Sequence, residues 1–256
     1  MKFEVNKDVF SEAVSFAVKL LPQRTTLPIL SGVLITVEDD TVTISSFDYE
    51  VSAKTKVAAS VDTPGQVLVS GRLLSEIAQR LPEDSVTLSL SGTSVSVVSG
   101  SAKFTLATMP VEEYPNLPEV EGVSGSVSGE EFSQAVGQVA PAASRDDVTP
   151  VITGVLLDVS SSALVMMATD RYRVAAKELS WSGGSVAAEG LQALIPSRTL
   201  AEIGKTFAHT SHLTITLSVG GERELVAFSS DQRTVTTLLI KGSFPPVQKL
   251  FPETTP

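Results

Sequence analysis

The stretch LPILSGVLITV, residues 27–37, recurs as TPVITGVLLDV at residues 149–159, 122 positions further along the chain. Both copies place a proline second and a glycine sixth, and both continue into a run of apolar and β-branched residues. Such runs, bounded by turn residues, are typical of strands. One match of this kind can arise by chance, whereas a series of matches in the same order indicates a duplicated unit.

Further pairs follow in that order. FSEAV (10–14) matches FSQAV (132–136) at the same offset of 122. The other pairs are Asp48 with Asp170, Arg72 with Arg198, and Tyr114-Pro115 with Phe244-Pro245. A unit of about 125 residues is longer than the 20–50 residues of solenoid repeats, so each copy is expected to be a domain. The acidic, glycine- and serine-rich stretch 119–126 separates the copies, and we predict domains at 1–122 and 128–252.

Each copy carries two helical patterns and several β-rich runs. Apolar residues recur at helical spacing in 7–21 and 130–140, and again in 72–81 and 198–207. Runs such as VTISSF and HLTITLSV, separated by short polar turns, indicate antiparallel strands. The predicted fold class is therefore α+β, with two amphipathic helices packed on antiparallel sheets in each copy. The polar faces of the helices are expected to lie on one side.

Composition limits the class of protein. With 42% hydrophobic residues among 256, the chain can bury sizeable cores. The sequence has no cysteine, which excludes disulfides, cysteine-ligated zinc and thiol nucleophiles, and which favours a cytoplasmic location. No apolar run approaches the ~18 residues of a membrane span, and the first residues show no signal-peptide pattern, so no membrane partner is expected.

The net charge of −10 argues on its face against nucleic acid as a partner. The distribution of charge indicates otherwise, because basic residues gather on the polar faces of the second helix of each copy: Arg72, Arg80, Arg198 and Lys205. Acidic residues concentrate in the connections, such as 38–40. Since charges are screened over about 8 Å at physiological salt, a basic face can meet phosphates on an acidic chain. The alternative is that these side chains are simply solvated.

No catalytic or metal-binding motif is complete. Gly204-Lys205-Thr206 resembles the end of a phosphate-binding loop, but position 199, where that motif needs glycine, is threonine. The only histidines, His209 and His212, have no further ligands at a readable spacing and form no nucleophilic triad. The sequence therefore predicts no enzyme, no metal site and no cofactor.

The stretch MATDRYRV, residues 167–174, joins an apolar strand end to two arginines around a tyrosine. Thr169 and Asp170 interrupt the apolar run, which Val174 resumes. Such a patch can bind an anion, hold a partner protein or form an exposed strand edge. Its residues alone leave these three alternatives open.

Several segments together resemble one known family. They are MKFEVNKDVF, RTTLPILSGVLI, FDYEVSAK, VLVSGRLLSEI, KFTLATMPVEEYPNLP, ATDRYRVA and GSFPPVQKLFP. They are similar to the bacterial replicative sliding clamp, the β subunit of DNA polymerase III holoenzyme, along nearly the whole chain. The resemblance implies a homodimeric ring of six similar domains whose helices surround double-stranded DNA without reading its sequence. It implies no catalysis, and partners that include the polymerase III α subunit, the clamp loader and other proteins with clamp-binding motifs.

The resemblance also implies site residues. ATDRYR matches one wall of a hydrophobic pocket for short linear motifs, although many members have Gly-His in place of Arg171-Tyr172. The matching pocket positions are Ile152, Thr169, Arg171, Tyr172, Arg173, Val174, Pro245, Lys249 and Leu250. The matching DNA-contacting positions are Arg24, Arg72, Arg145 and Arg198, to which the helix faces add Arg80 and Lys205. The edge near Phe104 and Leu106 matches the head-to-tail subunit interface.

Members of the family have three such domains, whereas this chain stops after the second. We therefore expect the chain to be a fragment that lacks the third domain, with an unusually short member of the family as the alternative, and to be monomeric or weakly associated. The alternative is a duplicated α+β scaffold that binds protein or carbohydrate and has no DNA function. The two hypotheses differ in a simple observation, because a scaffold predicts no DNA binding at all.

Overall fold

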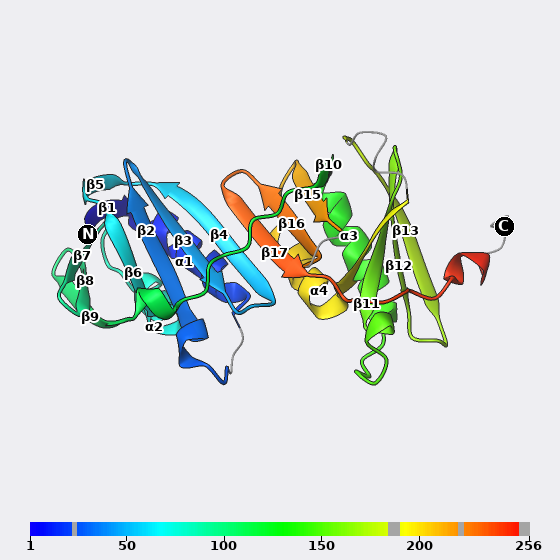
Figure 1. Cartoon of the computed structure of the whole chain (residues 1–256). Coiled ribbons are helices and arrows are strands. Elements are labelled where there is room, and N and C mark those ends of the chain that lie inside the picture. Colours follow the sequence, from blue (N-terminus) through cyan, green and yellow to red (C-terminus); the bar gives the residue numbers. More distant parts are fainter. Residues whose placement is uncertain (22–24, 184–189, 220–222, 251–256) are drawn as a thin grey trace. The chain divides into compact units, whose positions relative to one another are not determined.

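The computed structural model describes residues 1–21, 25–183, 190–219 and 223–250, without the side chain of Leu250 (Figure 1). The chain divides into two compact units. One consists of Met1–Pro118 with Asp231–Val235, and the other of Glu119–Ser230 with Thr236–Pro256. Both are built of helices on mostly antiparallel sheets, so the predicted α+β class is confirmed. None of the helices in these described ranges is long and apolar enough to cross a membrane.

The first unit contains nine strands hydrogen-bonded in the order β4-β3-β2-β6-β9-β8-β7-β1-β5. In chain order the strands are β1 (Lys2–Asn6), β2 (Gly32–Glu38), β3 (Thr41–Phe47), β4 (Val51–Ala58), β5 (Ser60–Thr63), β6 (Gly65–Ser70), β7 (Ser85–Ser91), β8 (Ser94–Ser99) and β9 (Ala102–Met109). The 3-10 helices are η1 (Pro28–Ser31) and η2 (Val111–Glu113). All the pairings between these strands are antiparallel.

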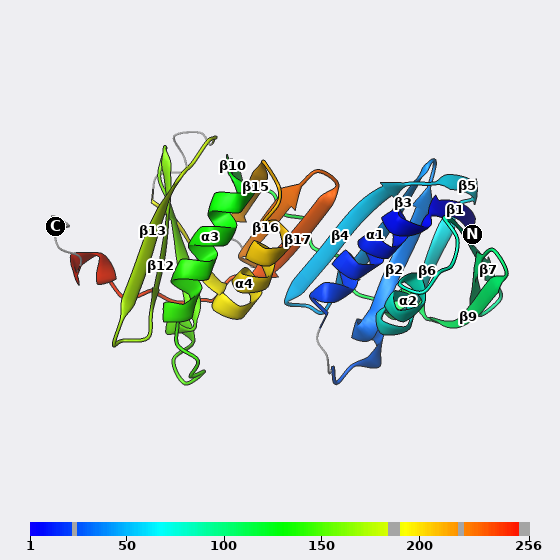
Figure 2. The ribbon, with the colours of Figure 1, turned by 180° about the vertical axis from the view of Figure 1, so that it is seen from behind.

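Two helices cover one face of these strands (Figure 2). Helix α1 (Lys7–Lys19) begins at Asn6, whose side-chain oxygen accepts hydrogen bonds from the N–H groups of Asp8 and Val9 at 2.9 and 3.3 Å. Helix α2 (Gly71–Ala78) begins at Ser70. Their apolar stripes meet the strands in one core, with Phe10 and Leu74 fully buried. The sequence predicted both helices, which end two or three residues earlier than expected.

The second unit repeats this plan. Its strands are β10 (Val123–Val127), β11 (Gly154–Val159), β12 (Ala163–Thr169), β13 (Val174–Ser180), β14 (Leu191–Pro196), β15 (Leu213–Ser218), β16 (Leu225–Ser230) and β17 (Arg233–Leu238), of which the first three residues of β17 are grouped with the first unit. They follow the orders β13-β12-β11-β14 and β10-β15-β16-β17. The 3-10 helices described here are η3 (Ala140–Ala142), η4 (Pro150–Ile152) and η6 (Val247–Leu250).

Helices α3 (Gly129–Val139) and α4 (Ser197–Thr206) take the places of α1 and α2. Ser128 caps α3, and Pro196 precedes α4 without a side-chain cap. The ring of Phe132 lies 5.5 Å from that of Phe228, centroid to centroid, in the core between helix and sheet. The predicted ranges 130–140 and 198–207 each differ by one residue at either end.

The duplication extends to the register of the strands. In the first unit Leu34 faces Ser45 and Gly32 faces Ser70, and in the second Leu156 faces Met167 and Gly154 faces Pro196. The two glycines are needed for the same reason in both units, since a Cβ would lie 2.7 Å from Leu68 Cδ1 at Gly32 and 2.8 Å from Leu194 Cδ1 at Gly154. The repeat therefore describes a structural duplication, strand by strand.

Candidate functional site

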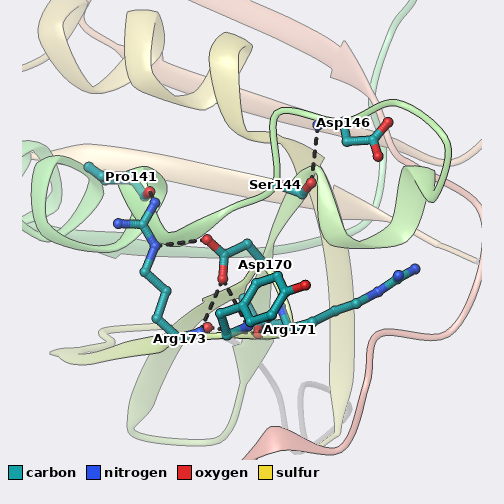
Figure 3. Close-up of polar contacts among 8 residues, drawn as sticks. Pro141, Ser144, Asp146, Asp170, Arg171 and Arg173 are labelled. Atoms are coloured by element: carbon teal, nitrogen blue, oxygen red, sulfur yellow. Dashed lines mark hydrogen bonds and ion pairs between the residues drawn. The ribbon is translucent and has the colours of Figure 1, made fainter.

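The turn between β12 and β13 is organised by Asp170 (Figure 3). Its Oδ1 accepts hydrogen bonds from the N–H groups of Tyr172 and Arg173 at 3.1 and 3.0 Å. Its Oδ2 pairs with Arg173 Nε at 2.9 Å, and Arg173 Nη2 donates to the Pro141 carbonyl at 2.6 Å. The turn is thus attached to the segment that follows α3.

The charge of Asp170 is favoured by this arrangement. Partial burial raises the pKa of its carboxyl, but the N–H groups of Tyr172 and Arg173 and the guanidinium of Arg173 outweigh that effect, and the net pKa is lowered. Asp170 is therefore an anion at neutral pH. Its negative charge neutralises Arg173.

The same turn occurs in the first unit. Asp48 Oδ1 accepts from the N–H groups of Glu50 and Val51 at 2.9 and 2.7 Å. Tyr49 has a φ of 76° and its counterpart Arg171 a φ of 79°, a left-handed conformation that few residues other than glycine adopt. The turn therefore follows from the aspartate that both copies share. What differs is the side chains that it displays.

An apolar cluster lies beside this turn. Leu156, Met167, Leu194 and Val247 are buried in it, and Val151, Val165, Val174, Ile240 and Phe244 pack against them, partly exposed. Figures 1 and 2 place the segment that carries Phe244 and Val247 on the face of the sheet opposite α3 and α4. A hollow beside the cluster is lined by Leu156, Leu194, Ile240 and Phe244 and by the polar side chains of Gln192, Glu224 and Ser243, and none of the described predicted pocket residues lines it. The site thus has an apolar floor that the helices do not use.

The predicted pocket residues divide into a base and a rim. Ile152 and Thr169 are buried, and Thr169 Oγ1 donates to the Arg173 carbonyl at 2.8 Å and accepts from the Arg171 N–H at 3.1 Å. Val174 and Pro245 are half-buried. Arg171, Tyr172 and Arg173, all in the turn, form the exposed rim, and Lys249 of η6 is also exposed. The side chain of Leu250 lies outside the described part of the chain.

Sequence reasoning missed several residues of the apolar floor. Leu156, Leu194, Ile240 and Phe244 line the hollow, although none was predicted there. The available signal was strand alternation, since Leu156 and Leu194 face one another across β11 and β14 while their neighbours face the helices. The returning segment after β17 has no periodicity, so its place on the sheet could not be read.

The corresponding face of the first unit is arranged differently. Its cluster contains Phe47, Leu68 and Tyr114. The Tyr114 hydroxyl accepts a hydrogen bond from the Phe47 N–H at 2.7 Å and donates to the Gly32 carbonyl at 3.2 Å. In the second unit Thr169 and Phe244 stand at the positions of Phe47 and Tyr114, so this hydroxyl is missing there.

A second candidate surface lies at the ends of the helices. In the first unit, Lys19 of α1 and Arg72 of α2 line one hollow together with Ser31, Ser70, Gln79 and the carboxylate of Glu76. In the second unit, Arg145 and Arg198 line the equivalent hollow beside the end of α3. The structure thus brings Arg145 and Arg198 together. Lys19 was expected on the polar face of its helix but was not assigned to the DNA-contacting residues.

The other predicted basic residues differ in whether a carboxylate pairs with them. Arg80 and Arg198 are exposed. Arg72 Nε pairs with Glu76 Oε1 at 3.0 Å, and Lys205 Nζ pairs with Glu202 Oε1 at 2.7 Å, so part of their charge is neutralised within the same helix. Arg24 lies outside the described residues.

Strand β9 carries the two predicted interface residues. It pairs with β8 from Ala102 to Ala107, but with β6 only at Thr108 and Met109, so one edge of 102–107 has no strand beside it in the described structure. Leu106 is buried in the core, and Phe104 packs against it, partly exposed. Any partner at this edge would therefore meet the backbone and the outer side chains.

The described residues hold no group of three or more His, Asp or Glu side chains that could bind a metal ion. What the site offers is apolar surface, a charged rim and two basic hollows. These features suit the binding of other molecules.

Family models and known relatives match this chain along nearly its whole length and indicate the same family. The N-terminal domain model of the DNA polymerase III beta subunit matches residues 1–118, and the central domain model of the same subunit matches residues 126–246. The beta sliding clamp of Micrococcus luteus is 44% identical, with 100% of this chain and 82% of that protein covered. That of Streptomyces coelicolor is 43% identical, with 98% and 67% covered.

Solved structures of similar fold belong to the same family. The sliding clamp of Bacillus subtilis superimposes with a TM-score of 0.91 at 26% identity, covering 99% of this chain and 68% of the other. The chain therefore belongs to the family of the bacterial DNA polymerase III beta subunit, whose members are the non-catalytic sliding clamps of DNA replication.

Proposed function

We propose that this chain holds duplex DNA against the helix-bearing faces of its two units and binds partner proteins through the apolar site of the second unit. The observation that carries the DNA function is the pair of equivalent hollows. Each is lined by an arginine at the start of the second helix, Arg72 or Arg198, and by a second cation, Lys19 or Arg145. Arg72 and Arg198 are equivalent in the repeat, whereas Lys19 and Arg145 are not, and Glu76 also lines the first hollow.

The chemistry of these hollows suits phosphates. Exposed guanidinium and ammonium groups neutralise backbone charge without reading bases, so affinity is expected to be independent of sequence and strongly dependent on salt. Arg72 and Lys205 already have carboxylate partners, which weakens their contribution. We propose Arg145 and Arg198, with Arg80, as the stronger contacts, and Arg24 as a further one.

The apolar site suits a short peptide from a partner protein. Val151, Val174 and Phe244, which are partly exposed around the buried cluster, provide apolar surface for anchors, and Tyr172, which is 97% exposed, provides an aromatic group at the rim. We propose that the polymerase III α subunit, the clamp loader and other proteins with clamp-binding motifs use this site. Ile152, Thr169, Pro245, Lys249 and Leu250 belong to the same proposal.

Assembly is proposed from the edge of β9. Its unpaired backbone groups at residues 102–107 can extend a sheet of another subunit, as expected for the homodimeric ring of the family. We propose clamp domains at 1–122 and 128–252. The 256-residue chain by itself is expected to be monomeric or weakly associated, and the absence of cysteine supports a cytoplasmic site of action.

The DNA function is tested by titrating two labelled duplexes of equal length and different sequence with the chain. We expect equal, weak binding in the range of about 10⁻⁴–10⁻⁶ M that falls steeply with salt. Arg198→Glu should weaken both complexes. Lys103→Glu makes the same change of charge on β9, where Phe104 and Leu106 face the core and Lys103 faces the other way, and should have little effect. A preference for one sequence, or equal effects of the two variants, would contradict the proposal.

A further inference from the structure

The two arginines at the rim of the apolar site have different surroundings. Arg173 is engaged by the Asp170 carboxylate and the Pro141 carbonyl. Arg171 Nη2 donates to the hydroxyl of Thr149 at 2.6 Å, and Arg171 has no carboxylate partner within the described structure. Figure 3 shows the two side chains pointing away from one another. Arg171 therefore keeps a full charge available to a ligand, whereas Arg173 serves the turn.

The backbone of the turn does not explain the choice of arginine. Tyr49 adopts nearly the same positive φ as Arg171 at the equivalent position of the first unit, so the conformation belongs to the turn and accepts unrelated side chains. Glycine would adopt it without strain. The positive φ of this turn therefore does not require the guanidinium of Arg171.

The rim has a charge opposite to that of the chain. Asp170 neutralises Arg173, whereas the described residues give Arg171 no carboxylate partner, in a chain of net charge −10. Val174, in the strand that follows the turn, belongs to the apolar floor. A ligand that fits both features has apolar side chains for the floor and a negative charge beside them.

We propose that Arg171 is a specificity-determining residue, which selects peptides that carry a carboxylate next to their apolar anchors. This inference rests on the proposed peptide-binding function of the second unit and names the class of its partners. An exposed charge pair of this kind is expected to favour the acidic peptide about three- to fivefold over its neutral counterpart. Because the pair is exposed, the preference should disappear at high salt.

The experiment uses two capped peptides with the same apolar residues, one with aspartate and the other with asparagine at a single position. Their affinities for the 256-residue chain are measured by fluorescence anisotropy at low and high salt. The wild type should prefer the aspartate peptide, Arg171→Gln should bind both equally, and Arg171→Lys should keep part of the preference. Thr149→Val is the matched control, since it removes the internal acceptor of Arg171 without removing the charge, and it should keep the preference.

Each contrary outcome has a distinct meaning. A preference that survives Arg171→Gln and is lost in Lys249→Gln would overturn the inference and leave the peptide site intact. If Arg171→Gln weakened duplex binding and left the peptide preference unchanged, the guanidinium would serve nucleic acid, which also overturns it. If neither peptide bound the wild type, the proposed peptide site itself would fail.

Discussion

The hydroxyl of Tyr114 lies 2.7 Å from the backbone nitrogen of Phe47, 67 residues earlier in the chain. It joins the segment that follows η2 to the end of β3, and it also donates to the Gly32 carbonyl at the start of β2. One buried phenol thus connects three parts of the first unit. The second unit has Phe244 at this position and lacks the connection.

The first prediction concerns Tyr114→Phe. It removes only the hydroxyl and leaves the Phe47 N–H and the Gly32 carbonyl without this partner, so we expect the free energy of unfolding to fall by about 1–3 kcal/mol. Tyr172→Phe makes the same change on a side chain that is 97% exposed and should leave stability unchanged. Urea denaturation of both variants measures the difference. If the two variants were equally stable, the hydrogen bonds of Tyr114 would contribute nothing to the stability of the fold.

The second prediction concerns alkaline pH. Burial raises the pKa of Tyr114 to about 12, and the Phe47 N–H only partly opposes this. Because the folded pKa exceeds the unfolded value of about 10, the neutral phenol stabilises the fold fully below pH 10, and this contribution is lost as the pH rises from 10 to 12. The stability difference between wild type and Tyr114→Phe should therefore shrink across that window. A difference that stayed constant to pH 12 would contradict it.

The third prediction concerns two glycines of the second unit. Gly154→Ala would place a Cβ 2.8 Å from Leu194 Cδ1 and 3.0 Å from the Ile195 carbonyl, and should destabilise the chain by about 1–3 kcal/mol. Gly137→Ala makes the same substitution inside α3, where nothing lies within 4 Å, and should stabilise it by about 0.5–1 kcal/mol. Thermal denaturation measures whether each variant is less or more stable than the wild type. A Gly154→Ala variant that was more stable would show that β11 and β14 are less closely packed.

The fourth prediction concerns the apolar floor. Val174→Asp would set a carboxylate where a peptide's apolar side chain has to lie, and should weaken peptide binding at least about tenfold. Val148→Asp makes the same change at a side chain that is 84% exposed, and should have little effect. Arg171→Ala, at the rim, should cost less than Val174→Asp. Calorimetry with one clamp-binding peptide ranks the three variants, and a loss of binding in Arg171→Ala alone would indicate an anion site.

The fold could be predicted largely from local patterns. Helix α1 follows from the spacing of Phe10, Ala13 and Val14 and from the cap at Asn6, all of which lie within a few turns of one another. The repeat in turn fixed which segments of the second unit correspond to α1 and β2. Each of these signals depends on neighbours in the sequence.

The site could be predicted only in part, because its contacts join distant residues. Arg173 was assigned to the pocket, but its guanidinium reaches Pro141, 32 residues away, which no periodicity indicates. Leu106 was assigned to an interface, yet its side chain lies in the core of the first unit. The meeting of Arg145 and Arg198 in one hollow likewise depends on how the segment after α3 folds back beside α4.

The first unit has the Tyr114 hydroxyl, whereas the equivalent residue of the second unit, Phe244, has none, so the same face of the sheet is held differently in the two units. A single unit would need the same face of its sheet both to stabilise the fold and to bind a partner. In the first unit the phenol ties the segment after η2 to β2 and β3, whereas the second unit, with Phe244 and Thr169 at these positions, has no such tie on the face where we propose that peptides bind. The two units differ here by a single oxygen atom at one position, Tyr114 against Phe244, and by a smaller side chain at the other, Phe47 against Thr169.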